Sequence, residues 1–353
     1  MKVGILTFTY GDNFGQRLQN YALQCRLASM GCDVFTLRQT GRKKNKSYEL
    51  KQFIKGCMGK SDYIMKMKRH RKFADFDRQY ISYYPERIGE GCIPEGLNEE
   101  FDYFVCGSDQ IWSPFSDDVN DTLFLTFAPR EKRISYAASI AADSIPEENQ
   151  DKYKNRLCGF ERISLREDRL SDWIERNTGV KPEIHIDPVL LFDSGFWSSI
   201  SRKPGGLRDK KYILSYFLGS NSRFKDMVSE YGLEDYEIID LMNDKAWYYI
   251  RPDEFVYLVR NAEAVITDSY HGVLFSVLFH KAFAAADRQD ELSDMSSRLA
   301  YILSLLGLED RWCSRLQGDK LNGSIDYEAV DRILAEQREK SDRYLRECLK
   351  RIN

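Results

Sequence analysis

Short apolar runs typical of buried parallel strands alternate along the chain with longer segments whose apolar residues recur at helical spacing. The run at residues 2–8 breaks at a polar turn, and residues 17–31 then show helical periodicity and lead into a strand at 32–38. This order predicts a βαβ unit at the start of the chain. Further β-rich runs occur at 101–107, 133–139, 162–167 and 182–187.

The second half of the chain repeats the alternation after the polar turn at 202–211. Strand patterns at 212–220, 236–241 and 264–269 alternate with helix patterns at 224–233, 253–264 and 271–283 and predict a second parallel α/β unit. We therefore expect two Rossmann-like domains, residues 1–200 and 201–353, which face a central cleft. Residues 326–351 predict one long amphipathic helix, and we expect it to pack back on the first domain.

A basic segment interrupts the first domain. Residues 41–100 lack the clear strand pattern, and we interpret them as an insertion, with twelve Lys or Arg residues between Arg42 and Lys72. Two interpretations remain open. The segment is either a solvated excursion, as most charge runs are, or a docking surface for anionic lipid or a lipid-linked acceptor.

Composition narrows the class of protein. A length of 353 residues exceeds the roughly 250 at which single cores divide, and a net charge of −3 argues against a nucleic-acid binder. The eight cysteines include no C-x-x-C pair, and the N-terminal run lacks a signal-peptide cleavage pattern. These features favour a cytoplasmic protein. The basic segment adds the option of peripheral contact with the inner face of the membrane.

Ligands of open α/β sheets bind beyond the carboxyl ends of the strands, so the loops there are the place to look for a site. These loops combine glycine or serine with charged and amide side chains, as a site for a polar anionic ligand would. The same residues are also ordinary turn and cap formers. The loops are 9–16, 107–112, 166–168, 219–221 and 268–272.

Arg166 and His271 are the strongest candidates within these loops. Arg166 directly follows an apolar β run and must find an anion or a carboxylate, for which Asp187 is the structural alternative. His271 begins an apolar helix, where free N–H groups favour a bound anion, although a buried packing histidine fits the pattern equally well. No H-E-x-x-H or similar spacing is present, so we expect no metal site.

At these residues the chain resembles the polysaccharide pyruvyl transferases. The resemblance rests on six motifs in order: NFGQRLQNYAL (13–23), CGSDQIW (106–112), ISYAASIA (134–141), SLRED (164–168), DPVLLF (187–192) and ITDSYHGVLFSVLFHKAF (266–283). The chain departs from the family pattern at Phe14, Tyr270 and Ala282, where tyrosine, phenylalanine and proline are usual.

The resemblance implies a fold similar to the GT-B glycosyltransferases and transfer of a pyruvyl group from phosphoenolpyruvate to a saccharide or lipid-linked saccharide. The product would be a pyruvate ketal, formed in exopolysaccharide biosynthesis without a cofactor. It implies that Arg166 and His271 are essential, and we assign His271 as general acid and Arg166 as the partner of the donor's carboxylate or phosphate. The remaining expected site residues are Asp109 as base and Asn13, Gly15, Ser108, Gln110, Ser269 and Gly272 as substrate-binding groups.

Two other functions remain open on the sequence. A GT-B glycosyltransferase that uses a nucleotide sugar would have the same architecture. A non-catalytic saccharide-binding protein could retain the fold, although an intact Arg166 and His271 count against it. The identity of the donor that binds separates the first alternative from pyruvyl transfer.

Overall fold

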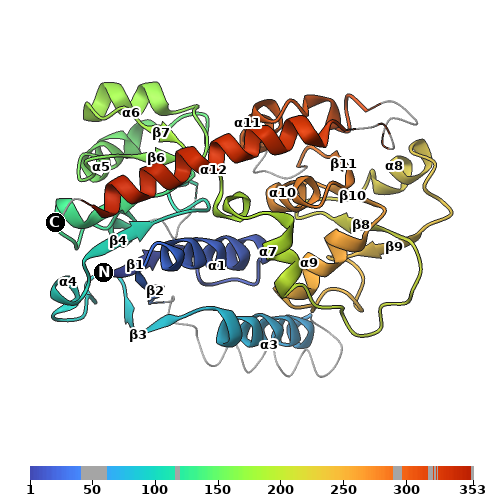
Figure 1. Cartoon of the computed structure of the whole chain (residues 1–353), viewed down its shortest axis with the longest axis horizontal. Helices are drawn as coiled ribbons and strands as arrows, with labels where there is room; N and C mark the ends of the chain where they lie inside the picture. The colour runs from blue at the N-terminus through green and yellow to red at the C-terminus, as the bar shows by residue number, and fades with distance from the viewer. Residues whose placement is uncertain are drawn as a thin grey trace.

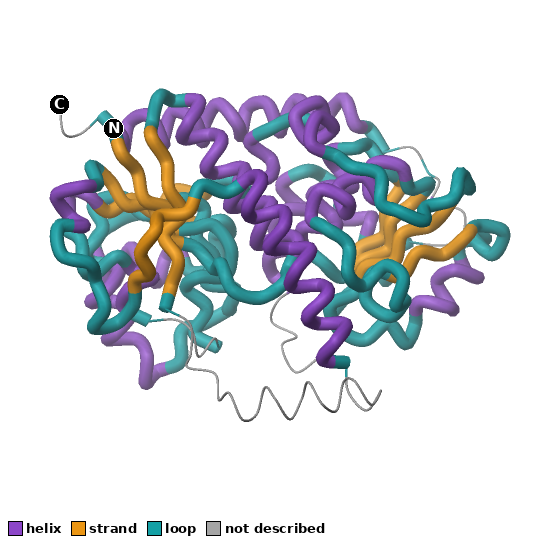
Figure 2. The backbone as a smooth tube through the Cα atoms, turned by 90° about the horizontal axis from the view of Figure 1, so that it is seen from below, coloured by secondary structure: helices purple, strands orange, loops and turns teal. Residues whose placement is uncertain are grey.

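The structure is a computed structural model that describes residues 1–40, 62–115, 120–288, 296–316, 321, 323 and 325–350. Two parallel sheets lie toward opposite ends of the molecule, and helices fill the space between them (Figure 2). No helix within these ranges is long and apolar enough to cross a membrane.

The first sheet has the strand order β3-β2-β1-β4-β5, with all neighbouring strands parallel. Its strands are β1 (Lys2–Leu6), β2 (Asp33–Gln39), β3 (Tyr83–Ile88), β4 (Tyr103–Cys106) and β5 (Arg133–Ser135). A two-stranded sheet, β6 (Ser164–Leu165) and β7 (Glu183–Ile184), follows through a bridge between Ala138 and Leu165. The helices of this half are α1 (Phe14–Ser29), α3 (Tyr63–Tyr80), α4 (Leu97–Glu100), α5 (Glu147–Leu157), α6 (Ser171–Thr178) and α7 (Ser194–Ile200), with the 3₁₀ helices η1 (Asp121–Phe124), η2 (Arg130–Lys132) and η3 (Pro188–Leu191).

The second sheet has the order β11-β10-β8-β9 and is also parallel. Its strands are β8 (Tyr212–Tyr216), β9 (Glu237–Asp240), β10 (Ala264–Thr267) and β11 (Ala282–Ala285). In the described part of this half, four α-helices and one 3₁₀ helix accompany them: α8 (Phe224–Glu230), α9 (Pro252–Asn261), α10 (Tyr270–Leu278), α11 (Ser296–Leu305) and η5 (Glu309–Arg311).

Aromatic packing joins the two halves into one continuous core. Phe14, at the start of α1, stacks on Phe255 of α9 with ring centroids 4.7 Å apart, and it also contacts Tyr216 at the end of β8. The three side chains belong to one buried apolar cluster that includes residues of both sheets. The loops at the start of α1 are therefore held at a fixed position against the second sheet.

The C-terminal helix α12 (Tyr327–Leu349) crosses from the half with the second sheet to the half with the first (Figure 1). Near its end Tyr344 Oη donates a hydrogen bond to the carbonyl oxygen of Ser135, at 2.9 Å, and Glu347 pairs with Arg162 at 2.8 Å. The expected packing of this helix on the first half is confirmed. So is the GT-B-like arrangement of two Rossmann-like sheets.

The structure differs from the sequence prediction at two elements. Residues 83–88, within the predicted insertion, form the edge strand β3, whose residues 85–87 are exposed and whose Pro85 is tolerated at an edge. The apolar run 271–283, expected as one helix, instead ends α10 at Leu278 and continues as β11. A run that is apolar throughout carries no periodicity to separate a buried helix from a buried strand.

The basic segment is only partly within the described residues. Its first part, 42–61, lies outside them, and the remainder begins α3. Membrane or lipid docking by this segment stays a prediction, as does the domain boundary near residue 200.

Candidate functional site

A cavity that opens to solvent lies where the carboxyl ends of the two sheets meet. Most of its lining comes from the loops after β1 and β4 in the first sheet and after β8 and β10 in the second, and Arg288 after β11 and Arg298 on α11 add to it. Strands β1 and β4, and likewise β8 and β10, are the two strands at which the strand order of their sheet reverses, the position where open α/β sheets bind their ligands. The lining residues are Asn13, Gln16, Asp109, Gln110, Leu218, Asp268, Ser269, Tyr270, His271, Arg288, Arg298 and Leu299.

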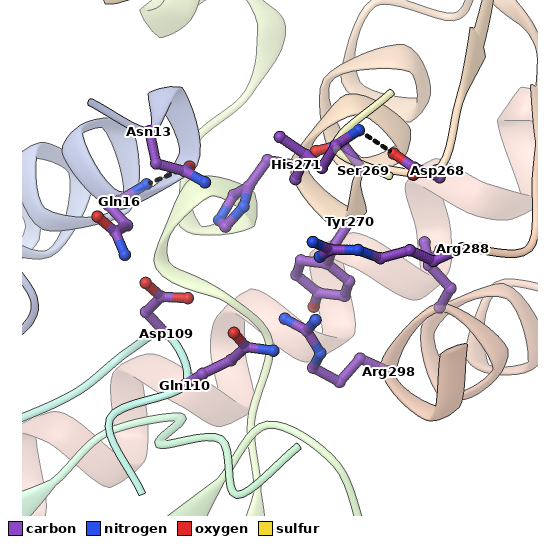
Figure 3. Close-up of a pocket in the computed structure, with 12 residues that line it drawn as sticks. Asn13, Gln16, Asp109, Gln110, Asp268, Ser269, Tyr270, His271, Arg288 and Arg298 are labelled. Carbon is purple, nitrogen blue, oxygen red and sulfur yellow. Dashed lines mark hydrogen bonds between the residues drawn. The ribbon is translucent and has the colours of Figure 1, made fainter. Parts of the chain in front are cut away.

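His271 lies in the first turn of α10 and points into this cavity, on the side of Asn13 and Asp109 (Figure 3). Ser269 begins the helix, because its Oγ accepts a hydrogen bond from the N–H of Gly272 at 3.3 Å. The Nε2 atom of His271 is buried and lies 3.5 Å from Oδ2 of Asp187. The histidine therefore has a carboxylate behind it and the cavity in front of it.

Gly15 makes the position of His271 possible. A Cβ atom built on Gly15 would lie 2.0 Å from Nδ1 of His271 and 2.4 Å from its Cγ, closer than any real contact. Gly272 allows α10 to pack closely on the end of β10, since its Cβ would lie 2.6 Å from Oγ1 of Thr267. Gly15 is therefore needed for the position of the histidine ring, and both glycines lie outside the cavity lining.

Asp187 joins His271 to Arg166. Its Oδ2 atom lies 2.8 Å from Nη1 of Arg166, and both side chains are fully buried, with 0% and 1% of their surface exposed. Burial alone would raise the pKa of the Asp187 carboxyl, but His271 and Arg166 together hold the pKa well below its usual range. The carboxylate is therefore charged at neutral pH and lies between Arg166 and His271.

Arg166 lies behind the wall of the cavity. Its guanidinium packs over the ring of Tyr270, 4.5 Å from the ring centroid, and its Nε is 3.8 Å from Oε2 of Glu167. Tyr270 is a lining residue, whereas Arg166 is outside the lining. Arg166 therefore pairs with Asp187, which the sequence analysis gave as its structural alternative to an anionic ligand. Tyr270 lies between Arg166 and the cavity.

Two other arginines face the cavity, Arg288 and Arg298 (Figure 3). Burial, with the nearby charge of Arg166, lowers the pKa of Arg298 to about 10, so its guanidinium remains protonated at neutral pH. When its amide oxygen faces Arg298, Gln110 accepts hydrogen bonds from Nη2 at 2.6 Å and from Nη1 at 3.2 Å. The two arginines make this side of the cavity suited to an anion.

The loops that carry these groups are tied to one another. Both carboxylate oxygens of Asp268 accept backbone hydrogen bonds from the loop after β8, at 2.7 Å from Leu218 N and 2.8 Å from Gly219 N. In the first half, Ser108 Oγ donates to the carbonyl oxygen of Ala137 at 2.7 Å and lies 3.4 Å from Asp187 Oδ2. Ser108 therefore supports Asp187 from behind the cavity.

The expected site residues divide into two groups. Those that line the cavity are Asn13, Asp109, Gln110, Ser269 and His271, and those that lie behind it are Gly15, Ser108, Arg166 and Gly272. The sequence analysis missed Arg288 because it follows β11, the strand that was merged into the preceding helix. It missed Arg298 because no motif marks this position on α11. Among the described residues, no group of three or more His, Cys, Asp or Glu side chains could hold a metal ion.

Comparisons with solved structures give matches over nearly the whole chain at low identity. The UDP-GlcNAc 2-epimerase of Methanocaldococcus jannaschii is 11% identical, covers 95% of this chain and 92% of its own, and has a TM-score of 0.48. The UDP-GlcNAc 2-epimerase of Neisseria meningitidis bound to UDP-GlcNAc is 10% identical, with 96% and 100% covered and a TM-score of 0.39. The glycosyltransferase SsfS6 of Streptomyces sp. SF2575 is 10% identical, with 96% and 95% covered and a TM-score of 0.36. TM-scores below 0.5 carry no argument about function.

Sequence comparison is more decisive. No curated protein matches the chain at a significant level. The family model for polysaccharide pyruvyl transferase, however, matches residues 13–290, a range that begins at Asn13 in the cavity and includes His271, Asp187, Arg166 and Arg288. The chain therefore belongs to the polysaccharide pyruvyl transferase family.

Proposed function

We propose that this protein transfers a pyruvyl group from phosphoenolpyruvate to two hydroxyls of a saccharide and so forms a pyruvate ketal. Membership of the family supports a transferase. One observation carries the finer proposal: His271, backed by the buried carboxylate of Asp187, shares one cavity with Arg288 and Arg298. A proton donor and two cations are the groups that an anionic enol donor requires.

The donor carries a phosphate and a carboxylate, and we assign both to the cationic side of the cavity. Arg288 and Arg298 can each present a planar fork of N–H donors to an oxyanion. Burial strengthens such contacts because little water competes for the anion. Backbone N–H groups in the first turn of α10, next to Ser269, can add to the binding of the phosphate.

The reaction begins when the methylene carbon of the donor takes a proton, which leaves the carbon that bears the phosphate electron-deficient. A sugar hydroxyl adds to this carbon and loses its proton. A second hydroxyl then displaces inorganic phosphate and also loses its proton, which completes the ketal. The step that needs a general acid is the first one.

His271 is the proposed general acid. Asp187 faces its Nε2 atom, stabilises the protonated imidazole and leaves Nδ1 as the nitrogen that can donate. A positioned acid of this kind contributes about 10²- to 10⁴-fold to the rate. Arg166 acts through Asp187 and Tyr270 and is a positioning residue, because it has no direct access to the cavity.

Asp109 is the proposed base for the sugar hydroxyl. It lines the cavity on the side opposite Arg288 (Figure 3), and its carboxylate belongs to the loop after β4. Its backbone φ of 68° is in the left-handed region, which aspartate tolerates better than most residues. Asn13 lines the same cavity from the start of α1, where an amide can orient the same hydroxyl.

The test combines turnover with donor binding. Phosphate release from phosphoenolpyruvate is measured across a panel of lipid-linked saccharides, and thermal unfolding is followed with phosphoenolpyruvate or nucleotide sugars. A hundredfold excess of phosphoenolpyruvate over its dissociation constant should stabilise the protein by about 2.7 kcal/mol. Stabilisation by a nucleotide sugar, with none by phosphoenolpyruvate, would favour the glycosyltransferase alternative instead.

A further inference from the structure

A second cavity opens beside the first. We call it the tyrosine cavity. It shares two lining residues, Asn13 and Leu218, with the first cavity, so the two are neighbours on either side of the loop that begins α1. Its lining is Asp12, Asn13, Lys66, Arg69, Tyr216, Leu218, Met242 and Tyr248.

The two cavities differ in their chemistry. The first gathers His271, Arg288 and Arg298 and suits a small anion. In the tyrosine cavity, rings and apolar side chains from the loops after β8 and β9 face a carboxylate and an amide from the loop after β1. Apolar faces with a few polar groups at one edge suit a sugar, whose ring has C–H faces and a rim of hydroxyls.

Arg69 is part of the wall of the tyrosine cavity. Its Nε and Nη2 atoms donate to the carbonyl oxygen of Asp12, at 3.0 and 2.8 Å, and its Nη1 donates to the carbonyl oxygen of Tyr248. The guanidinium also packs 4.6 Å from the ring centroid of Phe14 and 4.8 Å from that of Tyr248. Because these contacts occupy all three nitrogen atoms, Arg69 holds the two halves of the wall together.

The polar groups of the wall can serve a sugar. The Asp12 side chain is only 18% exposed, and its Oδ1 lies 3.1 Å from Nδ1 of His70, which keeps the carboxylate at the edge of the cavity. Carboxylate oxygens accept hydrogen bonds from hydroxyls, and the Asn13 amide can both donate and accept them. Asn13 is also the residue that a sugar would pass on its way to the donor carbon near His271.

We propose that the tyrosine cavity binds the saccharide acceptor, with a sugar ring against Tyr248 and its hydroxyls directed past Asn13 to the donor. This inference rests on the proposed function, since it assigns the second substrate of that reaction. It makes Tyr248 and Met242 determinants of acceptor binding and leaves donor binding to the first cavity.

The experiment measures saccharide binding to the full chain by saturation-transfer-difference NMR in the presence of phosphoenolpyruvate. The probes are p-nitrophenyl β-glycosides of glucose, galactose, mannose and N-acetylglucosamine. Tyr248→Ala should weaken the best probe about fivefold to tenfold, the size expected for the loss of one aromatic stacking contact. Tyr248→Phe should recover most of the affinity, and Met242→Trp, which fills the cavity, should abolish binding.

Tyr249→Ala is the matched control, because Tyr249 is the neighbouring half-buried tyrosine and lies outside the lining. It should bind the probes as the unmodified protein does. The inference is overturned if no glycoside binds the unmodified protein, or if Tyr248→Ala and Met242→Trp both leave binding unchanged. Failure of the proposed function has a different signature, namely that phosphoenolpyruvate does not stabilise the unmodified protein in thermal unfolding.

Discussion

Replacing Asp187 by asparagine tests the link between the buried carboxylate and His271. The substitution keeps the size of the side chain, and the Asn oxygen can still accept the hydrogen bond from Val189 N, which Asp187 Oδ1 accepts at 2.9 Å. What it removes is the negative charge between Arg166 and His271. The change therefore isolates the electrostatic role of this position.

The expected loss of stability follows from burial. Removing one partner of a buried ion pair costs about 3–5 kcal/mol, and Arg166 keeps Glu167 at 3.8 Å, so we expect a cost of about 3 kcal/mol for Asp187→Asn. Folding lowers the pKa of Asp187, so its contribution is fully present above the ordinary value of 3.8 and is lost as the pH falls below it. At pH 7 the variant should therefore show the full loss of about 3 kcal/mol in its free energy of unfolding.

Turnover should fall by at least about 10²-fold at pH 7, the lower end of the range for a positioned acid. Asp193→Asn is the control, since Asp193 also caps a helix, accepting from Phe196 N at 2.9 Å, but is exposed and outside the cavity lining. A folded Asp187→Asn protein with normal turnover would refute the reasoning.

Three further predictions concern His271, Gly15 and His185. His271→Gln should keep the stabilisation by phosphoenolpyruvate in thermal unfolding but lose about 10²- to 10⁴-fold in turnover, and near-normal turnover would exclude it as the general acid. Gly15→Ala should lower turnover and cost about 1–3 kcal/mol in urea unfolding, because its Cβ would collide with the His271 ring; a fully active variant would show that the ring can move freely. Burial lowers the pKa of His185 from 6.5 to about 3, so its neutral form stabilises the fold above pH 6.5 and the protein should lose about 2 kcal/mol between pH 7 and 5. In His185→Gln this part of the pH dependence should disappear, and an unchanged slope would contradict the assignment.

The amino-acid sequence alone determined the class of fold and most of the elements. The alternation of apolar runs and helical periodicity predicted the strands of both sheets except β3 and β11, as well as the long helix α12. Strands β3 and β11 were not predicted, and the reasons are opposite. β3 has exposed residues at its centre and so lacks an apolar run, whereas β11 continues an apolar run that had already been assigned to α10.

The sequence also identified the loops of the site, because residues after parallel strands meet at one edge of a sheet. It could not decide which side chains of these loops face the cavity. Arg166 and His271 looked alike as charged or titratable residues at the ends of apolar runs, yet one lies behind Tyr270 and the other lines the cavity. The difference depends on the packing of α10 against η3 and Asp187, which sequence spacing does not encode.

Only the tertiary structure placed Arg298 opposite His271 and opened the tyrosine cavity between the two halves. Arg298 is on α11, outside every motif, and Arg69 reaches both Asp12 and Tyr248 from α3. These contacts join residues up to 179 positions apart, which local preferences of the chain cannot specify. They arise because the aromatic core around Phe14 and Phe255 fixes one sheet against the other, and the position of every group between the sheets follows from that packing.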